Sequence, residues 1–319
     1  MKIALAVNPR ASFGRGRHAG GAAAECFRAA GAEVELLCEE SYAALAARVA
    51  DAVAGGVDAL VVVGGDGMVH LGVNALAAVP AVAGTEGGGA DGGVSSAAAG
   101  NAAGTPLGII PTGTGNDLAR MLELPRHDIP AAVERVLAAL GSGGRRIDAG
   151  RAVSAGRTHW FAGVLSAGFD AAVNERANAW RWPRGQSRYN LAMIRELAGF
   201  TAIDYTLTVD GERRRQGAML VSVANGRSMG GGMAIAPEAS LEDGLLDLFV
   251  VHPLSRAALL AVFPKVFTGR HVDHPAVELR RVRRVVLEAD GVVAYADGER
   301  LGPLPLTIDV VPGALRVLA

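Results

Sequence analysis

Residues 59–67 read ALVVVGGDG, and this stretch decides the fold of the first half of the chain. An unbroken apolar run predicts a strand that is buried on both faces, as in a parallel sheet covered by helices. The glycines end the strand, and the segment after Gly67 predicts a helix. A glycine-rich turn between a strand and a helix lets backbone N–H groups approach a phosphate. Taken alone, the turn is equally compatible with an ordinary tight turn.

The same alternation of strand and helix extends to both sides of this stretch. Strands are predicted at residues 3–7, 34–37, 59–63 and 107–110, and helices at 17–30, 43–54, after 67 and at 130–140. This order predicts a doubly wound α/β domain with a parallel sheet over residues 1–145. Residues 81–104 interrupt the order with Gly, Ala and Ser, and they predict a flexible insertion whose role the sequence does not tell.

After Asp148 the pattern changes to strands. They are predicted at residues 159–165, 205–209, 219–224, 246–251, 277–287, 292–295 and 306–311, with helical stretches at 190–198 and 256–267. Such spacing with turn signals predicts an antiparallel β-sandwich domain over residues 146–319. The sequence leaves open whether the last strand belongs to this domain or returns to the first.

Composition excludes several classes of protein. Half of the 319 residues are apolar, which is enough for two packed cores, and the formal net charge is −1. A nucleic-acid binder usually carries a strong basic excess, so no nucleic-acid partner is expected. No apolar run approaches the roughly 18 residues that span a bilayer. We therefore expect a cytoplasmic protein that touches a membrane only peripherally, and a homodimer is left open.

A second glycine-rich turn follows the strand at residues 107–110. Residues 109–120 read IIPTGTGNDLAR, and they repeat the order of strand, turn and helix. Asn116 and Asp117 fall where the helix begins, where such side chains commonly act as caps. Because the carboxyl ends of parallel strands share one edge of a sheet, two such turns together resemble the walls of a nucleotide-phosphate site.

Two acidic motifs lie in the second half. Residues 230–247 read GGGMAIAPEASLEDGLLD, and the Asp-Gly pair at 243–244 either holds a hard cation with backbone carbonyls or forms a hairpin turn. Asp297-Gly298-Glu299 reads by itself as a turn with a solvated acid.

Taken in order, these motifs resemble the diacylglycerol kinase catalytic-domain family, which includes soluble bacterial lipid kinases and sphingosine kinases. The resemblance rests on Asn8-Pro9, the two glycine-rich turns, the 230–247 block and the closing Asp297-Gly298-Glu299. It extends from residue 3 to about residue 318. It implies an ATP- and Mg²⁺-dependent kinase whose second domain takes a diacylglycerol-like lipid, with the active site in the cleft between the domains.

The resemblance also implies roles for individual residues. Glu299 looks like the general base, and Asp66 looks like the residue that serves the nucleotide-bound Mg²⁺. Asp243, with the carbonyls of Ser240 and Leu245, looks like a structural Mg²⁺ site that Asp148 links to the cleft. The expected nucleotide-binding set is Asn8, Gly64, Gly65, Asp66, Gly67, Thr112, Gly113, Thr114, Gly115, Asn116 and Asp117.

Some residues depart from the family pattern. Met68 and His70 stand where the family often has Thr and Asn, which leaves the nucleotide preference open. Residues 180–189 read WRWPRGQSRY, a composition that suits a membrane interface or an ordinary helix edge. The alternatives are a NAD kinase-like enzyme, which shares the Gly-Gly-Asp-Gly turn, and a non-catalytic lipid- or nucleotide-binding protein on the same scaffold.

Overall fold

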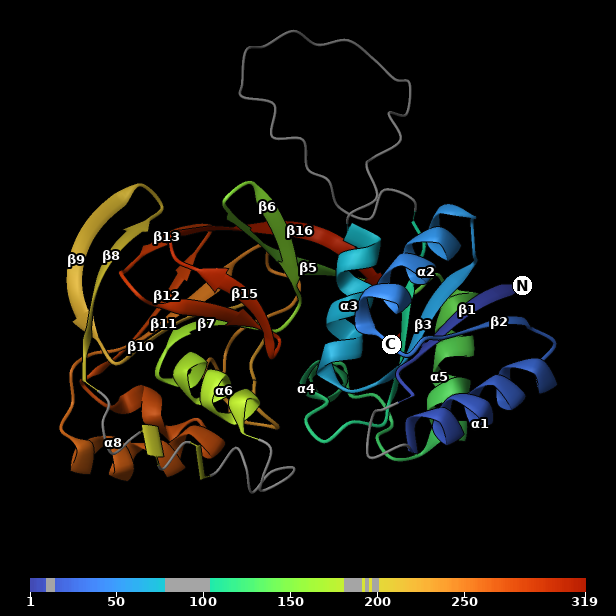
Figure 1. Cartoon of the computed structure of the whole chain (residues 1–319), viewed down its shortest axis with the longest axis horizontal. Coiled ribbons are helices and arrows are strands. Elements are labelled where there is room, and N and C mark those ends of the chain that lie inside the picture. Colours follow the sequence, from blue (N-terminus) through green and yellow to red (C-terminus); the bar gives the residue numbers. More distant parts are fainter. Residues whose placement is uncertain (10–14, 78–103, 181–190, 193–194, 197–200) are drawn as a thin grey trace, which may run out of the picture. The chain divides into compact units, whose positions relative to one another are not determined.

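A computed structural model of the chain describes residues 1–9, 15–77, 104–180, 191–192, 195–196 and 201–319. These residues form two compact units (Figure 1). The first unit comprises residues 1–113, 122–147 and 313–319, and the second comprises 114–121 and 148–312. This division differs from the expected boundary at 145/146 in two short segments. Residues 114–121 group with the second unit, and the last residues group with the first.

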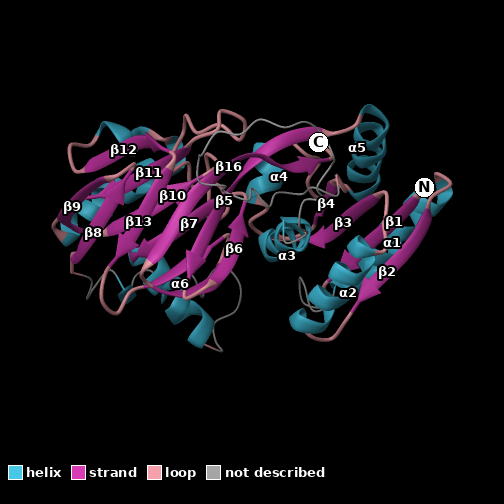
Figure 2. Ribbon diagram, turned by 90° about the horizontal axis from the view of Figure 1, so that it is seen from above, coloured by secondary structure: helices cyan, strands magenta, loops and turns pink. Residues whose placement is uncertain are grey.

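The first unit is built on four parallel strands, as the apolar runs predict. The strands are β1 (Lys2–Val7), β2 (Glu33–Cys38), β3 (Ala59–Gly64) and β4 (Leu107–Pro111). Their order in the sheet is β2-β1-β3-β4, which Figure 2 shows. The residues of β3 and β4 are buried along their whole length, because helices cover both faces.

The helices of this unit divide between the two faces of the sheet. They are α1 (Arg15–Ala29), α2 (Tyr42–Ala54), α3 (Asp66–Ala77) and α5 (Ile129–Ser142). Apolar residues of α1 and α5 form one core with Leu5 and Val61. On the other face, a Cβ at Gly72 of α3 would lie 2.8 Å from Leu107 and 3.1 Å from Val62, so the helix approaches the strands closely only because this residue is glycine.

The second unit is a β-sandwich, as expected from the strand spacing. One sheet contains β5 (Arg145–Ser154), β6 (Arg157–Phe161), β8 (Ile203–Val209), β9 (Glu212–Ala218), β13 (Arg284–Glu288) and β16 (Leu306–Val317). The other has the order β12-β11-β10-β7-β14-β15, with bounds Val277–Val282, Leu246–Val251, Leu220–Ala224, Val164–Gly168, Val293–Ala296 and Glu299–Pro303. Apolar residues from both sheets form a single core between them.

Short helices complete this unit. They are α4 (Asp117–Met121), α6 (Phe169–Ala179), α8 (Arg256–Val262) and the 3₁₀ segments η2 (Phe263–Thr268) and η3 (Arg270–Asp273). The predicted helix at 256–267 therefore ends as a 3₁₀ segment, because Pro264 cannot donate an intrahelical hydrogen bond. Within the described part of the chain, no helix is long and apolar enough to cross a membrane.

Two of the predicted strands were wrong, because the chain changes sheet inside each of them. The run at 277–287 is β12 in one sheet and β13 in the other, and the carboxylate of Asp210 accepts hydrogen bonds from the N–H groups of Arg283 and Arg284 at 3.0 and 2.9 Å. The run at 159–165 is β6 and β7, and here Asp297 accepts from the N–H groups of residues 162–164. In both places the chain passes from one sheet to the other, and the carboxylate of a distant aspartate accepts hydrogen bonds from backbone N–H groups at this crossing.

Other differences have local causes. β9 was missed because it reads ERRRQGA, yet it pairs with β8 across the Asp210-Gly211 turn. β16 continues beyond the expected end at residue 311, and Val317 pairs with Leu107 of β4. The expected insertion at 81–104, the helix at 190–198 and the aromatic-basic stretch lie largely or wholly outside the described residues.

Candidate active site

The expected nucleotide-binding turns of the first unit lie at one edge of its sheet. Val7, which precedes Asn8, pairs with Val63, and Gly64 pairs with Pro111. The N–H group of Thr112 donates to the carbonyl of Gly64 at 2.9 Å. The residues that follow β1, β3 and β4 are therefore neighbours at the carboxyl edge of a parallel sheet, where such folds bind their ligands.

The Gly-Gly-Asp-Gly turn starts α3 directly. The carbonyl of Gly65 accepts from the N–H groups of Met68 and Val69 at 3.0 and 3.2 Å, so the helix begins within the motif. The earlier N–H groups of the first turn lack partners within the helix, which makes this end suitable for an anion. A Cβ at Gly64 would lie 2.5 Å from the Cγ of Met68, so Met68 packs over the turn and requires glycine there. Met68 and His70, the two departures from the family pattern, are both buried.

The second glycine-rich motif is divided between the two units. Thr112 and Gly113 belong to the first unit, whereas residues 114–121 belong to the second. The carboxylate of Asp117 accepts from the N–H group of Gly231 at 2.7 Å and from the Ser228 hydroxyl at 3.4 Å. The Arg120 guanidinium donates to the Gly231 carbonyl at 3.4 Å. These contacts fix the glycine loop at 230–232, whose three residues all have positive φ.

Asp117 is thus an anchor of the second unit's own loop. Burial raises its pKa, and the Gly231 N–H group and the Arg120 charge offset that effect only in part. Asn116, which is buried with φ of 54°, holds the left-handed turn before α4. Nucleotide contacts of these two residues stay a prediction, as do those of the rest of the expected set.

Asp148 holds the loop of the expected structural cation site from two sides. Its N–H group donates to the Leu241 carbonyl at 2.7 Å, and its carboxylate accepts from the N–H group of Gly244 at 2.7 Å. Its own carbonyl accepts from the side-chain amide of Asn225 at 3.0 Å. Asp148 is buried, so these bonds give the loop one conformation.

The loop of the expected cation site carries an exposed carboxylate, that of Asp243. One of its oxygens accepts from the N–H group of Leu245 at 3.1 Å. The pKa of Asp247 is raised to about 6, because burial and, to a smaller extent, the charges of Asp243 and Glu238 outweigh the opposing charge of Arg281. Among the described residues, no group of three or more His, Cys, Asp or Glu side chains could hold a metal. A site of one carboxylate, backbone carbonyls and water is the pattern that remains compatible with the loop.

The Asp297-Gly298-Glu299 motif forms the turn of a hairpin between β14 and β15, with Ala296 paired to Glu299. Asp297 is not the solvated acid that the motif alone suggests. Its carboxylate accepts from the N–H groups of Ala162, Gly163 and Val164, each at 3.0 Å. The turn is therefore fastened to the crossing between β6 and β7, and Glu299, which is half-buried, begins β15 from a fixed position.

A second set of contacts holds the same hairpin against α6. The Tyr295 hydroxyl and the Arg300 guanidinium both donate to the carboxylate of Glu175, at 2.8 and 2.6 Å. The Arg300 bond and then the Tyr295 bond lower the pKa of Glu175. Tyr295 and Arg300 flank Glu299 in the sequence, so the expected base lies between two anchored residues. Sequence reasoning missed Glu175, because nothing local marks it.

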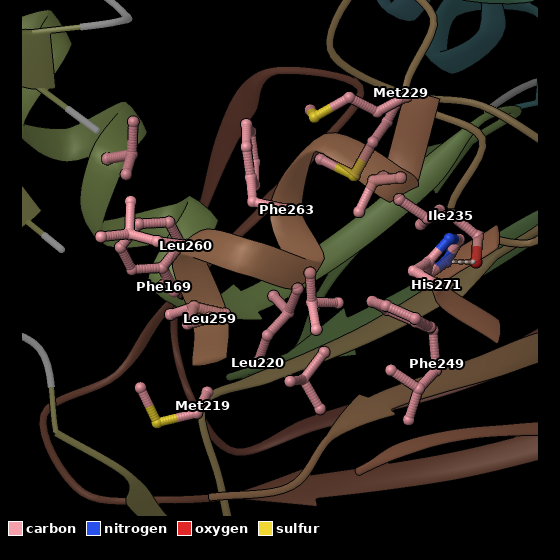
Figure 3. Close-up of a pocket in the computed structure, with 16 residues that line it drawn as sticks. Phe169, Met219, Leu220, Met229, Ile235, Phe249, Leu259, Leu260, Phe263 and His271 are labelled. Carbon is pink, nitrogen blue, oxygen red and sulfur yellow. Dashed lines mark hydrogen bonds between the residues drawn. The ribbon is translucent and has the colours of Figure 1, made fainter. Parts of the chain in front are cut away.

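An apolar cavity of about 150 Å³ lies inside the second unit (Figure 3). Fifteen of the sixteen residues that line it are apolar, and they come mainly from one sheet, from α6, α8 and η2, and from the loop between β10 and β11. Phe169, Leu220, Phe249, Leu259 and Phe263 are among them. Sequence reasoning did not find this cavity, because its residues are spread from 169 to 277 without a local pattern.

The single polar residue of the lining is His271. Its Nε2 lies 3.0 Å from the Ile235 carbonyl, and its ring meets Phe249 edge-on, with the centroids 5.4 Å apart. Burial lowers the pKa of His271. The ring is therefore neutral near pH 7, and the cavity carries no charge.

Comparison with known proteins assigns both halves of the chain. A family model for the diacylglycerol kinase catalytic domain matches residues 2–152, and one for the YegS C-terminal NAD kinase beta sandwich-like domain matches residues 163–319. A diacylglycerol kinase of Mycobacterium tuberculosis is 41% identical over 271 residues, which cover 84% of this chain and 79% of that protein. One of Bacillus subtilis is 28% identical over 201 residues, covering 62% and 64% of the two chains.

Solved structures share the fold. A crystal structure of a diacylglycerol kinase from Bacillus anthracis strain Sterne matches with a TM-score of 0.66 at 20% identity, covering 99% of this chain and 96% of that one. Another structure from the same organism gives a TM-score of 0.74 at 23% identity, with 99% and 94% covered. With the parallel sheet, the sandwich and the two family models in agreement, the chain belongs to the diacylglycerol kinase family of lipid kinases.

Proposed function

We propose that this lipid kinase transfers the γ-phosphoryl group of ATP to the free hydroxyl of a long-chain diacylglycerol in a Mg²⁺-dependent reaction. The observation that carries the choice of substrate is the apolar cavity of the second unit. A cavity of comparable size and lining in another protein stays dry and takes up apolar molecules, so this one suits a segment of an acyl chain. A NAD kinase would use charged and hydrogen-bonding groups to hold its dinucleotide, and this lining offers none beyond His271.

The first unit supplies the groups for the nucleotide. The residues after β1, β3 and β4 lie at one edge, and the start of α3 offers backbone donors for phosphate oxygens. Asp66, in the first turn of α3, would hold Mg²⁺, which neutralises charge on the phosphates when bound. Asp66→Asn should therefore abolish turnover in a protein that is still folded.

Glu299 serves as the general base in this proposal. It accepts the proton of the substrate hydroxyl as the hydroxyl oxygen attacks the γ-phosphorus, and ADP leaves with the bridging oxygen. A positioned base contributes on the order of 100- to 10,000-fold to such a step. The bonds of Asp297 and Glu175 would hold Glu299 in place for this role. Asp243, with the carbonyls of Ser240 and Leu245, would hold a second Mg²⁺ that stabilises the loop.

A change to the cavity wall tests the lipid assignment. Leu259→Trp should fill space that an acyl chain needs. If about three methylene groups lose contact at ~0.8 kcal/mol each, kcat/KM for dioleoylglycerol should fall roughly 50-fold. KM for ATP should stay near normal, because the nucleotide groups are on the first unit. Leu279→Trp is the matched control, because Leu279 is exposed on β12 and does not line the cavity.

The outcome separates the candidates. Equal kinetics of the two Trp variants would show that the cavity takes no part in substrate binding. Phosphorylation of NAD by the parent protein, without phosphorylation of diacylglycerol, would establish the dinucleotide-kinase alternative. ATP binding without transfer to any lipid would establish the non-catalytic one.

A further inference from the structure

The helical cover of the cavity has an unusual outer face. Leu260 of α8 and Phe267 of η2 are 56% and 53% exposed, the two highest values among the large hydrophobic residues that the structure describes. Apolar side chains of this size in water mark interaction surfaces when they are grouped. Arg256, Lys265 and Arg270 are exposed on the same segments. These five residues define the α8–η3 face.

The apolar part of this face continues into the cavity. Leu260 lines the cavity and is also more than half exposed, so the cavity wall reaches the surface there. Phe267 meets the ring of Phe263 edge-on, with the centroids 6.0 Å apart, and Phe263 lines the cavity. Figure 3 shows Leu259, Leu260 and Phe263 together on this side of the cavity.

Cations prevail on these segments, where the exposed Asp273 at the end of η3 is the one acid beside the three cations. No Asp or Glu occurs between Asp247 and Asp273, whereas Arg256, Lys265 and Arg270 lie within that run. In the described part of the chain, none of these three cations forms an ion pair, whereas four arginines of the sandwich strands do: Arg213, Arg214, Arg280 and Arg284. Their positive charge is thus available to an outside partner.

We propose that the α8–η3 face docks on an anionic lipid bilayer, with Phe267 and Leu260 entering the headgroup region and the three cations meeting lipid phosphates. Exposed apolar groups beside unpaired cations are the combination that binds such an interface. An acidic protein surface would also complement the three cations, but it would not account for the apolar cavity that lies directly behind the face. The inference rests on the proposed function, since docking here would bring the cavity to its substrate.

Vesicle sedimentation with the full chain tests the proposal. Vesicles of phosphatidylcholine with roughly one third phosphatidylglycerol, which give the surface a negative potential, are mixed with parent protein and with Lys265→Glu/Arg270→Glu. Loss of the two cations alone should weaken binding by about 30-fold, the two added carboxylates should weaken it further, and the parent's binding should fall as salt rises. Phe267→Ser should weaken binding at low and at high salt, because it removes apolar contact.

Two matched controls make the result specific. Arg215→Glu/Arg283→Glu changes the net charge equally at exposed arginines elsewhere in the second unit, and Tyr42→Ser removes an aromatic side chain that is 47% exposed in the first unit. Both controls should bind as the parent does. Equal losses in test and control variants, or normal binding by all of them, would overturn the proposal, and the latter would point to a protein partner.

Activity on soluble substrate separates this proposal from the proposed function. Lys265→Glu/Arg270→Glu should keep parental turnover on short-chain dioctanoylglycerol, because neither residue lines the cavity. A parent protein that phosphorylates no diacylglycerol would refute the proposed function, whereas the vesicle comparison would still decide the docking face.

Discussion

Asp297→Ala should destabilise the second unit and impair catalysis together. The carboxylate of Asp297 satisfies the N–H groups of Ala162, Gly163 and Val164, all at 3.0 Å. Leaving a buried donor unsatisfied costs about 1–3 kcal/mol. Because Asp297 itself is half-buried, water can reach part of the site, so we take the lower end for each bond and expect a loss of about 3 kcal/mol.

The assay is thermal unfolding combined with steady-state kinetics. For a unit of this size, a loss of that magnitude lowers the melting temperature by about 6–12 °C. Turnover should fall as well, because Glu299 loses its fixed position, while KM for ATP should change little. Asp210→Ala is the matched control: it removes the equivalent support at residues 283–284, so it should lower stability with normal turnover per folded molecule.

Gly163 offers an independent check of the same contact. A Cβ at Gly163 would lie 2.6 Å from the Oδ1 atom of Asp297, and among the described residues that are not its chain neighbours only Asp297 lies within 4 Å of it. Gly163→Ala should therefore be costly in the parent and much less costly in the Asp297→Ala background. Equal costs in both backgrounds, or a melting temperature of Asp297→Ala close to that of the parent, would refute the reasoning.

Three further predictions concern carboxylates of the second unit. Glu299→Gln should lower turnover by about 100-fold or more with near-normal KM for ATP, and a variant that instead loses ATP binding would move Glu299 to the nucleotide site. If the site binds Mg²⁺, a Mg²⁺ concentration about 100 times the Kd should stabilise the parent protein by about 2.7 kcal/mol and raise its melting temperature, and Asp243→Ala should abolish this rise. A parent protein whose melting temperature does not depend on Mg²⁺ would contradict the site. Asp247 has its pKa raised to about 6, so its contribution to stability is complete below pH 4 and is lost as pH rises through 6. In EDTA, the stability of Asp247→Asn minus that of the parent should therefore be larger at pH 8 than at pH 5. A difference that is the same at both pH values would contradict the raised pKa.

The first unit was the more predictable part, because its signals are local. A run such as Ala59–Val63 followed by Gly64-Gly65 determines both the buried strand and the turn, and parallel pairing then brings Thr112 beside Gly64. The sandwich strands Leu246–Val251 and Tyr205–Val209 were also evident from their apolar runs. The resemblance to the kinase family was confirmed by the family models and the curated relatives.

What the sequence did not reveal depends on partners far along the chain. The break between β6 and β7 requires Asp297, which lies more than 130 residues away, and the break between β12 and β13 requires Asp210. Glu175 can be recognised as an anchor only from its hydrogen bonds to Tyr295 and Arg300, which lie far along the chain. The cavity is likewise assembled from distant segments. Gly163 was the one local hint, since a glycine inside an apolar run often marks a close backbone approach.

Incubation of the purified protein with labelled ATP, Mg²⁺ and dioleoylglycerol in anionic vesicles tests the central claim most directly. The account predicts labelled phosphatidate, which requires Mg²⁺ and is reduced at least about 100-fold by Glu299→Gln. Label that appears only in NAD, or that reaches no lipid although the protein binds ATP, would contradict it.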